Sequence, residues 1–152
     1  MNAMPTPEPN VKQVIPFFCI TDMERSLRYY TEGLGFTRTN QWIVDGKIRW
    51  CWLQLGSAAL MLQSCGKKIL DSSPAGTKLG QGASMWFQCQ DAIALYHEFR
   101  SHGIEASEPQ VGNGLWDTML DDPDGYRLHF ESPADAPEET KLSEWTRATQ
   151  GE

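Results

Sequence analysis

Two stretches of this chain follow one pattern: Ile15-Pro-Phe-Phe-Cys-Ile-Thr-Asp22-Met-Glu-Arg-Ser-Leu-Arg-Tyr-Tyr30 and Ser84-Met-Trp-Phe-Gln-Cys-Gln-Asp91-Ala-Ile-Ala-Leu-Tyr-His-Glu-Phe99. Each begins with a short, mainly apolar run, reaches an aspartate and continues with apolar residues at helical spacing, which predicts a strand followed by a helix. At an offset of about 69 residues, Phe18 coincides with Phe87 and Asp22 with Asp91. Such self-similarity indicates that the unit is present twice.

The ends of the two units agree as well. Ala59-Leu-Met61-Leu-Gln63 matches Arg127-Leu-His129-Phe-Glu131 at an offset one residue shorter, with apolar residues at the same places. The alternative is that any two amphipathic strand and helix pairs resemble each other to some degree. Agreement at both ends favours duplication, and a single duplication is too short for a solenoid. We therefore predict two modules with a working surface between them.

The first module has the pattern of a strand, a helix and three strands. Both faces of the segment from Val11 to Ile20 are apolar, which is typical of a strand covered on both sides. Thr21-Asp-Met-Glu24 has the spacing of a capping box, so a helix is predicted to begin there and to end at Gly33. Strands are predicted over residues 36–44, 47–55 and 58–63, with a tight hairpin between the first two.

A second module follows a connection that is rich in glycine, serine and proline. Its predicted elements are a strand that begins after Gly82, a helix over 91–102, weaker strands over 105–111 and 115–120, a turn at Asp122-Pro-Asp-Gly125 and a last strand over 126–131. The predicted domain organisation is a mobile leader over residues 1–10, a first module over 11–64, a linker over 65–81, a second module over 82–132, and a tail over 133–152 with a short helix over 141–149.

The composition disfavours several classes of protein. At 152 residues the chain suits one compact domain or two small halves with a common core. A total of 20 acidic against 13 basic residues gives a net charge of −7, which disfavours nucleic acid as a partner and favours a cationic ligand. No apolar run is long enough for a membrane helix, and the start lacks the pattern of a signal peptide. We therefore expect a cytoplasmic protein that binds neither membranes nor nucleic acid.

The 4 cysteines do not indicate a metal site. Cys19, Cys51, Cys65 and Cys89 form no C-x-x-C pair and no regular spacing with histidines. Without a secretion signal, we expect reduced thiols, mostly buried in strands, and no zinc bound by them. The sequence also lacks a phosphate-binding loop, a nucleotide fingerprint and a Ser/His/Asp arrangement, so no cofactor is predicted.

The opening segment from Val14 to Phe36 and the closing segment Asp122-Pro-Asp-Gly-Tyr-Arg-Leu-His-Phe130 together resemble the vicinal oxygen chelate superfamily. This group includes glyoxalase I, extradiol dioxygenases, fosfomycin-resistance enzymes and bleomycin-resistance proteins. The resemblance covers about residues 11–132 and implies an α+β fold, in which two βαβββ modules form a curved, cup-shaped mixed sheet with helices on the outer face. The resemblance also implies that a ligand lies on the inner face.

In the metal-using members of that superfamily, four strand positions supply His, Gln or Glu to one divalent ion. The resemblance places these positions at Ile15, Met61, Ser84 and His129. Only His129 is a good ligand, and a single imidazole does not make a metal site. We therefore expect no bound metal. The chain is most similar to the metal-free bleomycin-resistance proteins, small acidic dimers that sequester a cationic, partly aromatic antibiotic.

Three hypotheses about function follow from the resemblance. The first is a small-molecule binding protein, a homodimer that protects against an antibiotic by holding it without altering it. The second is a metal-dependent lyase or dioxygenase with altered ligands, in which Glu131 or Gln63 joins His129 in a different strand register. The third is a cup that the chain's own Trp50, Trp52 and Trp86 fill. The alternative to ligand stacking by these tryptophans is packing in the core or at a dimer interface.

Strand alternation sorts the residues of the predicted cup. The helix-facing set is Phe18, Ile20, Leu60, Leu62, Met85, Phe87, Leu128 and Phe130. The predicted ligand-binding set is Phe17, Trp50, Trp52, Met61, Gln63, Trp86, Gln88, Arg127, His129 and Glu131. This set combines aromatic surface with polar groups, as a flat ligand with hydrogen-bonding groups requires. His129 is the candidate proton acceptor, or a polar side chain satisfied by its neighbours, and Asp22 and Asp91 are expected to cap helices.

Overall fold

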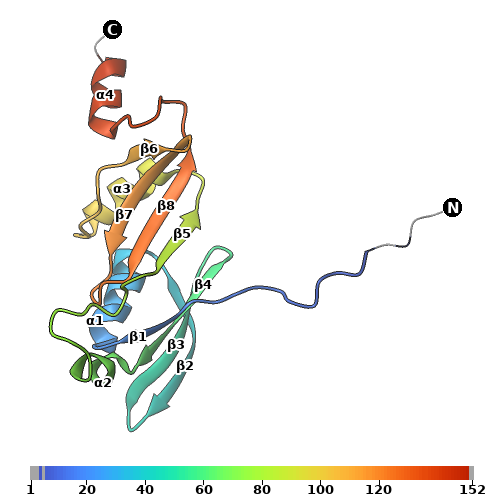
Figure 1. Ribbon diagram of the computed structural model, residues 1–152, viewed down its shortest axis with the longest axis vertical. Helices are drawn as coiled ribbons and strands as arrows, with labels where there is room; N and C mark the ends of the chain where they lie inside the picture. The colour runs from blue at the N-terminus through green and yellow to red at the C-terminus, as the bar shows by residue number, and fades with distance from the viewer. Residues whose placement is uncertain (1–3, 5, 151–152) are drawn as a thin grey trace.

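Two βαβββ modules follow each other along the chain in the computed structural model, which describes residue 4 and residues 6–150 (Figure 1). The first consists of β1 (Phe17–Ile20), α1 (Met23–Arg28), a π-helical turn η1 (Tyr29–Gly33), β2 (Thr37–Val44), β3 (Lys47–Leu55) and β4 (Ala58–Ser64). After α2 (Gly66–Asp71) come β5 (Ser84–Gln88), α3 (Ala92–Ser101), β6 (Gln110–Gly112), β7 (Leu115–Asp121) and β8 (Arg127–Pro133), and then α4 (Leu142–Gln150). The predicted α+β fold class is confirmed.

Each module forms its own four-stranded mixed sheet with the same strand order. Sheet A has the order β1-β4-β3-β2 and sheet B the order β5-β8-β7-β6. The first and last strands of each module are parallel neighbours, and Phe17 lies beside Met61 just as Trp86 lies beside His129. These two pairs occupy equivalent places, in agreement with the repeat in the sequence.

One hydrophobic core serves both modules. It gathers side chains from one face of each sheet and from the helices, including Phe18, Leu60, Phe99 and Phe130, which are each at most 3% exposed. Every residue of the predicted helix-facing set belongs to this core or packs against it, so the assignment of strand faces is confirmed for them. Burial of one large apolar side chain contributes roughly 1.5–3 kcal/mol. The common core therefore couples the stability of the two modules.

Polar contacts at the turn between β7 and β8 reinforce the junction. The Tyr30 hydroxyl donates a hydrogen bond of 2.7 Å to Oδ2 of the buried Asp122, whose Oδ1 accepts from the backbone N–H groups of Asp124 and Tyr126. Burial raises the pKa of the Asp122 carboxyl and raises that of the Tyr30 hydroxyl well above its ordinary value. The rings of Phe18 and Tyr126 stack with centroids 4.1 Å apart. The turn of the second module is thus anchored in the first.

Some elements differ from their predicted bounds. Strand β1 begins at Phe17 instead of Val11, because Pro16 has no N–H to donate and joins the sheet only through its carbonyl oxygen, which accepts from Met61. Residues 6–14 are exposed and extend away from the modules (Figure 1). Helix α2 lies within the predicted linker, and residues 1–3 and 5 of the predicted leader lie outside the described residues. No helix in the described part of the chain is long and apolar enough to cross a membrane.

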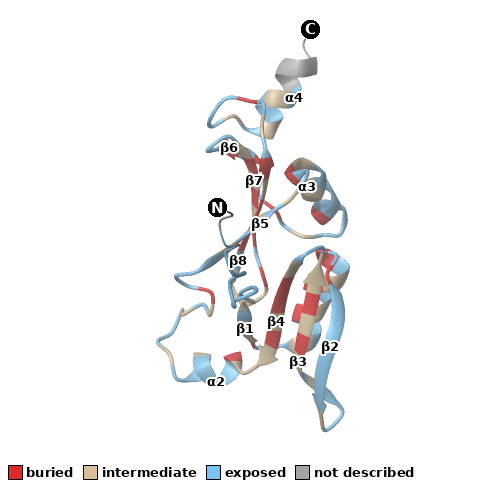
Figure 2. Ribbon diagram, turned by 90° about the vertical axis from the view of Figure 1, so that its right-hand side faces the viewer, coloured by how far each residue is buried: buried red, intermediate tan, exposed pale blue. Residues whose placement is uncertain are grey.

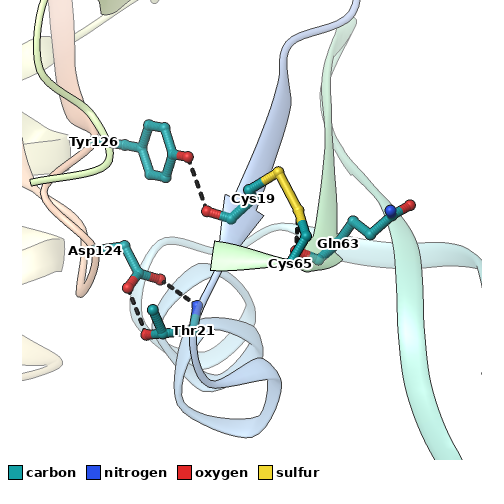
Figure 3. Close-up of a disulfide and its surroundings, with 6 residues drawn as sticks. All are labelled: Cys19, Thr21, Gln63, Cys65, Asp124 and Tyr126. Carbon is teal, nitrogen blue, oxygen red and sulfur yellow. Dashed lines mark hydrogen bonds between the residues drawn. A yellow bond between two sulfur atoms is a disulfide. The ribbon is translucent and has the colours of Figure 1, made fainter. Parts of the chain in front are cut away.

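The prediction of reduced cysteines is wrong for one pair. Cys19 and Cys65 form a disulfide with their Cα atoms 5.1 Å apart (Figure 3). In the parallel pairing of β1 with β4, Cys19 lies beside Gln63. Strand β4 ends at Ser64, so the chain leaves the strand direction at Cys65, and this turn keeps Cys65 within bonding distance of Cys19. Cys51 is a free, buried thiol whose pKa is raised to about 11 by burial. Cys89 is a free, half-buried thiol.

The two sheets are turned relative to each other. Sheet B shows its face in Figure 1 and its edge in Figure 2, whereas sheet A shows its face in Figure 2. In both modules the helix lies on the core side of its sheet (Figures 1 and 2). The opposite faces, named the inner faces below, therefore point away from the core in different directions.

Candidate functional site

The two inner faces carry the predicted ligand-binding residues in two groups. On sheet A, one row of neighbouring strands holds Phe17, Met61 and Trp52, and the next row holds Cys19, Gln63 and Trp50. On sheet B, one row holds Trp86, His129 and Met119, and the next row holds Gln88, Glu131 and Asp117. The structure thus brings the predicted residues together within each sheet.

His129 on β8 is the centre of the sheet B group. Its Nδ1 lies 3.0 Å from Oδ2 and 3.1 Å from Oδ1 of Asp117 on β7. On the other side, the indole of Trp86 on β5 stacks on the imidazole, with ring centroids 3.7 Å apart and planes 3° apart. Because both neighbours come from adjacent strands, the sheet register holds the imidazole in one orientation.

This orientation determines which ring nitrogen a ligand can reach. An ionised carboxylate only accepts hydrogen bonds. Nδ1 of His129 therefore carries a hydrogen and donates it in the hydrogen bond to Asp117. In the neutral imidazole Nε2 is then an acceptor, and within the described chain the ring makes its hydrogen bonds through Nδ1 alone. His129 is 9% exposed, so only a small part of this residue is open to a ligand. A ligand that donates an N–H or O–H group fits this nitrogen.

Trp86 offers aromatic surface beside that nitrogen. It remains 52% exposed although His129 covers one side of the indole. Its Nε1 donates to Oγ of Ser84 at 2.9 Å, which holds the ring in place. Trp86 also lines a cavity of about 360 Å³ between the modules, together with Ile15, Pro16 and Ala59. An aromatic part of a ligand can stack there.

The other predicted polar residues of sheet B bind partners of their own. Gln88 Nε2 donates to Oε1 of Glu131. Arg127 Nε lies 2.9 Å from Oδ1 of Asp121, and this hydrogen bond is the main cause of the lowered pKa of the Asp121 carboxyl. These side chains are therefore held at the border of the site, in positions where a ligand would have to compete with an existing partner.

Asp117 is the functional candidate that the sequence analysis missed. It lies in the middle of β7, on the inner face, directly beside Glu131. The available signal was an aspartate inside a predicted strand, where this residue is disfavoured. Its importance depends on the register between β7 and β8, which the sequence pattern did not define.

The sheet A group is mainly aromatic. Trp50 and Trp52 lie on the inner face, so their orientation, which the sequence left open, is settled. Trp42 on β2, also missed from the sequence, is the cross-strand neighbour of Trp50 and is 57% exposed. Together with Phe17, these side chains form an apolar surface with little cover in one chain. Exposed aromatic surface of this kind is typical of a binding or assembly site.

The two groups do not face each other across one cup in a single chain, because the inner faces point in different directions (Figures 1 and 2). A cavity of about 710 Å³ lies elsewhere, between α1, the end of α3 and the turn after β7. Its lining includes Arg28, Tyr29, His102 and Asp122 and none of the predicted ligand-binding residues. Burial raises the pKa of the Tyr29 hydroxyl in this cavity.

The donors at the expected metal positions do not fit a divalent ion. Ile15 has no donor atom, Met61 offers only a thioether, and Oγ of Ser84 accepts a hydrogen bond from Trp86. Across the described residues, no cluster of three or more His, Cys, Asp or Glu side chains is placed to hold a metal. Asp22 and Asp91, in contrast, cap α1 and α3 as predicted.

A family model for the Glyoxalase/Bleomycin resistance protein/Dioxygenase superfamily matches residues 13–130. The chain belongs to this superfamily. Its description covers both enzymes and a resistance protein, so membership establishes the fold and leaves the activity to be argued from the site. No curated protein matches the sequence.

Solved structures with the superfamily fold include TnmS3, an antibiotic binding protein from Streptomyces sp. CB03234, with 18% identity, a TM-score of 0.63 and coverage of 84% of this chain and 100% of that one. TioX from Micromonospora sp. ML1 has 16% identity, a TM-score of 0.61 and coverage of 81% and 99%. A bleomycin-binding protein in complex with bleomycin has 23% identity, a TM-score of 0.59 and coverage of 80% and 98%. At these identities the similarity establishes the fold alone.

Proposed function

We propose that this superfamily member binds a planar, hydrogen-bond-donating small molecule without a metal and without altering it, as an antibiotic-sequestering protein does. The observation that carries the proposal is the cluster of Asp117, His129 and Trp86. It presents a hydrogen-bond acceptor next to a half-exposed indole on an open sheet face. Antibiotic binding by structural neighbours such as TnmS3 supports the same function.

The ligand class follows from the charges around the cluster. Asp117 and Glu131 lie on the same face as His129, and the whole chain has a net charge of −7. A cationic aromatic compound is attracted to such a face, a neutral one is not repelled by it, and an anionic one is repelled. Trp86 adds a preference for cations, because the face of an indole attracts positive charge.

The proposed cup is completed by a second copy of the chain. Sheet A of one copy and sheet B of the other would supply the aromatic and the polar wall, respectively. Support comes from the inner faces of one chain, which point apart, and from Trp42, which is more than half exposed on its own sheet. Burial of such surface in a homodimer stabilises the assembly.

The experiment is calorimetric titration with bleomycin and with a panel of cationic, neutral and anionic aromatic compounds. Binding of cationic or neutral members is expected, with Trp86→Ala weakening it roughly tenfold through loss of stacking. Ile69→Ala, which removes an exposed apolar side chain on α2, is the matched control and should bind as wild type. An absence of heat across the panel, or equal affinity of the Trp86→Ala protein, would overturn the proposal.

One observation favours the metal-dependent alternative. A metal-binding histidine commonly donates its other N–H to a carboxylate, as His129 does to Asp117. Elemental analysis of protein purified without chelator separates the two functions. Stoichiometric zinc, nickel, manganese or iron that is lost in His129→Ala would favour the enzyme, and metal-free protein that still binds the panel would favour sequestration.

A further inference from the structure

A cavity of about 480 Å³ lies beside the disulfide, at the end of β1 and the start of α2. It is lined by Ile20, Thr21, Arg49, Ser64, Cys65, Lys67, Lys68 and Asp71. Half-buried Cys65 thus borders the cavity, whereas its partner Cys19 is not part of the lining. A small molecule in the cavity therefore lies next to Cys65 and not next to Cys19.

The charge at this cavity is opposite to that of the whole chain. Arg49, Lys67 and Lys68 line it against the single carboxylate of Asp71, in a protein with a net charge of −7. Within the described residues none of these three cations takes part in an ion pair. The hydroxyl of Ser64 adds a hydrogen-bonding group, whereas that of Thr21 donates to Asp124. The cavity therefore attracts small anions to the neighbourhood of Cys65.

The disulfide also lies at the junction of the two modules. The hydroxyl of Tyr126 donates to the backbone oxygen of Cys19 at 2.8 Å, and Asp124 accepts from the N–H of Thr21 at 3.1 Å and from its hydroxyl at 2.6 Å (Figure 3). Cys65 begins the connection that leads through α2 to β5. The disulfide therefore ties this connection to the strand end that holds the turn of the second module.

We propose that Cys65 is an exchange site for a small thiol that carries carboxylates, and that such a thiol opens the disulfide at the module junction. The three cations concentrate the anionic thiol in the cavity, and Cys65, which borders the cavity, receives the attack. The inference does not rest on the proposed binding function, because it uses none of the predicted ligand-binding residues, although Cys19 shares an inner-face row with Gln63 and Trp50. It assigns a redox role to the two cysteines that form the disulfide.

The chemistry is thiol–disulfide exchange. The thiolate of the small molecule attacks Sγ of Cys65, forms a mixed disulfide there, and expels Cys19 as a thiolate. A second small thiolate attacks the sulfur of the bound small molecule, which leaves as a symmetrical disulfide while Cys65 becomes a thiolate. Both cysteine thiolates then take up protons from water. The protein disulfide is reduced, and two small thiols are oxidised.

The first test compares the rates at which three thiols reduce the full chain: glutathione, which is anionic, 2-mercaptoethanol, which is neutral, and cysteamine, which is cationic. At equal thiolate concentration and low salt, glutathione should react fastest. Lys67→Gln with Lys68→Gln should slow glutathione roughly fivefold and leave 2-mercaptoethanol unchanged, and 0.5 M salt should remove the difference by screening. Lys12→Gln with Lys141→Gln, two exposed lysines that do not line the cavity, is the charge-matched control.

The second test locates the attacked sulfur by mass spectrometry of variants that each keep one of the two bridged cysteines, in a Cys89→Ser background that retains the buried Cys51. With Cys19→Ser, Cys65 should form a mixed disulfide with oxidised glutathione. With Cys65→Ser, Cys19 should form it at least several-fold more slowly, because it does not border the cavity. Equal modification of both cysteines, an unchanged rate in the double lysine variant, or the absence of the disulfide from unreduced wild-type protein would overturn the proposal.

Discussion

Sheets A and B share one topology, yet only their core faces are alike. Leu60 on β4 and Leu128 on β8 are equivalent and both fully buried. On the inner faces, Phe17 beside Met61 corresponds to Trp86 beside His129, and Trp50 on β3 corresponds to Asp117 on β7. Packing against the common core restricts the first set of side chains, and nothing comparable restricts the second. The duplicated scaffold thus carries one aromatic face and one polar face.

The largest expected effect is a loss of stability, and it tests whether the core faces of the two sheets are equivalent. Leu60→Ala and Leu128→Ala should each lower the free energy of unfolding by about 2–5 kcal/mol, through lost burial and the cavity left behind. Urea unfolding followed by circular dichroism measures both. Because one core serves both modules, each variant should unfold in a single transition. Two separate transitions, or a variant that loses less than about 1 kcal/mol, would contradict the common core.

The next prediction concerns the turns, which differ between the modules. The turn between β7 and β8 contains Asp122, which binds Tyr30 of the first module. Asp122→Asn should lower the free energy of unfolding by roughly 1–2 kcal/mol at pH 4. Ser57→Ala in the short turn between β3 and β4, where the side chain is exposed, is the control and should change stability little.

The pH dependence of that loss follows from the raised pKa of Asp122. In the unfolded chain an aspartate titrates near about 3.9, so the folded chain holds this proton to a higher pH. The stability that Asp122 contributes is therefore greatest below about pH 4 and falls as the pH rises through the folded-state pKa. The difference between wild type and Asp122→Asn should shrink between pH 4 and pH 7. A difference that grows over this range would show that burial does not raise the pKa of Asp122.

A smaller effect distinguishes the two inner faces in binding. Asp117→Asn should weaken ligands that donate a hydrogen bond by roughly fivefold, because Nδ1 of His129 loses its charged acceptor, and should leave ligands without donors unchanged. Trp50→Ala should weaken every aromatic ligand by a similar factor, irrespective of its donors. Calorimetric titration of matched ligand pairs measures both. If Asp117→Asn and Trp50→Ala weaken ligands with and without hydrogen-bond donors in the same proportion, the two inner faces do not have different roles in binding.

The smallest expected effect is that of metals. Zinc, nickel or manganese ions should leave the melting temperature of wild type unchanged, and His129→Ala should respond identically, because the other superfamily positions, Ile15, Met61 and Ser84, are poor ligands. Thermal unfolding with and without each ion measures this. A stabilisation that depends on His129 would make sheet B a metal-binding face.

Most of the fold could be predicted from local patterns in the sequence. Alternation assigned Phe18, Leu60 and Phe130 to the core, and aspartates before helical patterns identified the caps at Asp22 and Asp91. Each of these depends on a few neighbouring residues. The same reasoning predicts β1 too long, because an apolar pattern does not reveal the loss of pairing at Pro16.

The parts of the site that the sequence did not reveal depend on contacts between distant strands. Asp117 reaches His129 only through the register of β7 and β8, and Cys65 reaches Cys19 only through the pairing of β1 with β4. The relative orientation of the sheets depends on side chains from both modules, such as Phe18 and Tyr126. Periodicity within one segment contains no information about any of these contacts.

The common core has a consequence for each half of the chain taken alone. One module, with one sheet and one helix, would expose the apolar face that the other module covers. A domain of that length buries a smaller share of its surface on folding and is correspondingly marginal. A single module expressed alone is therefore expected to pair with a second copy through its exposed core face or to stay unfolded.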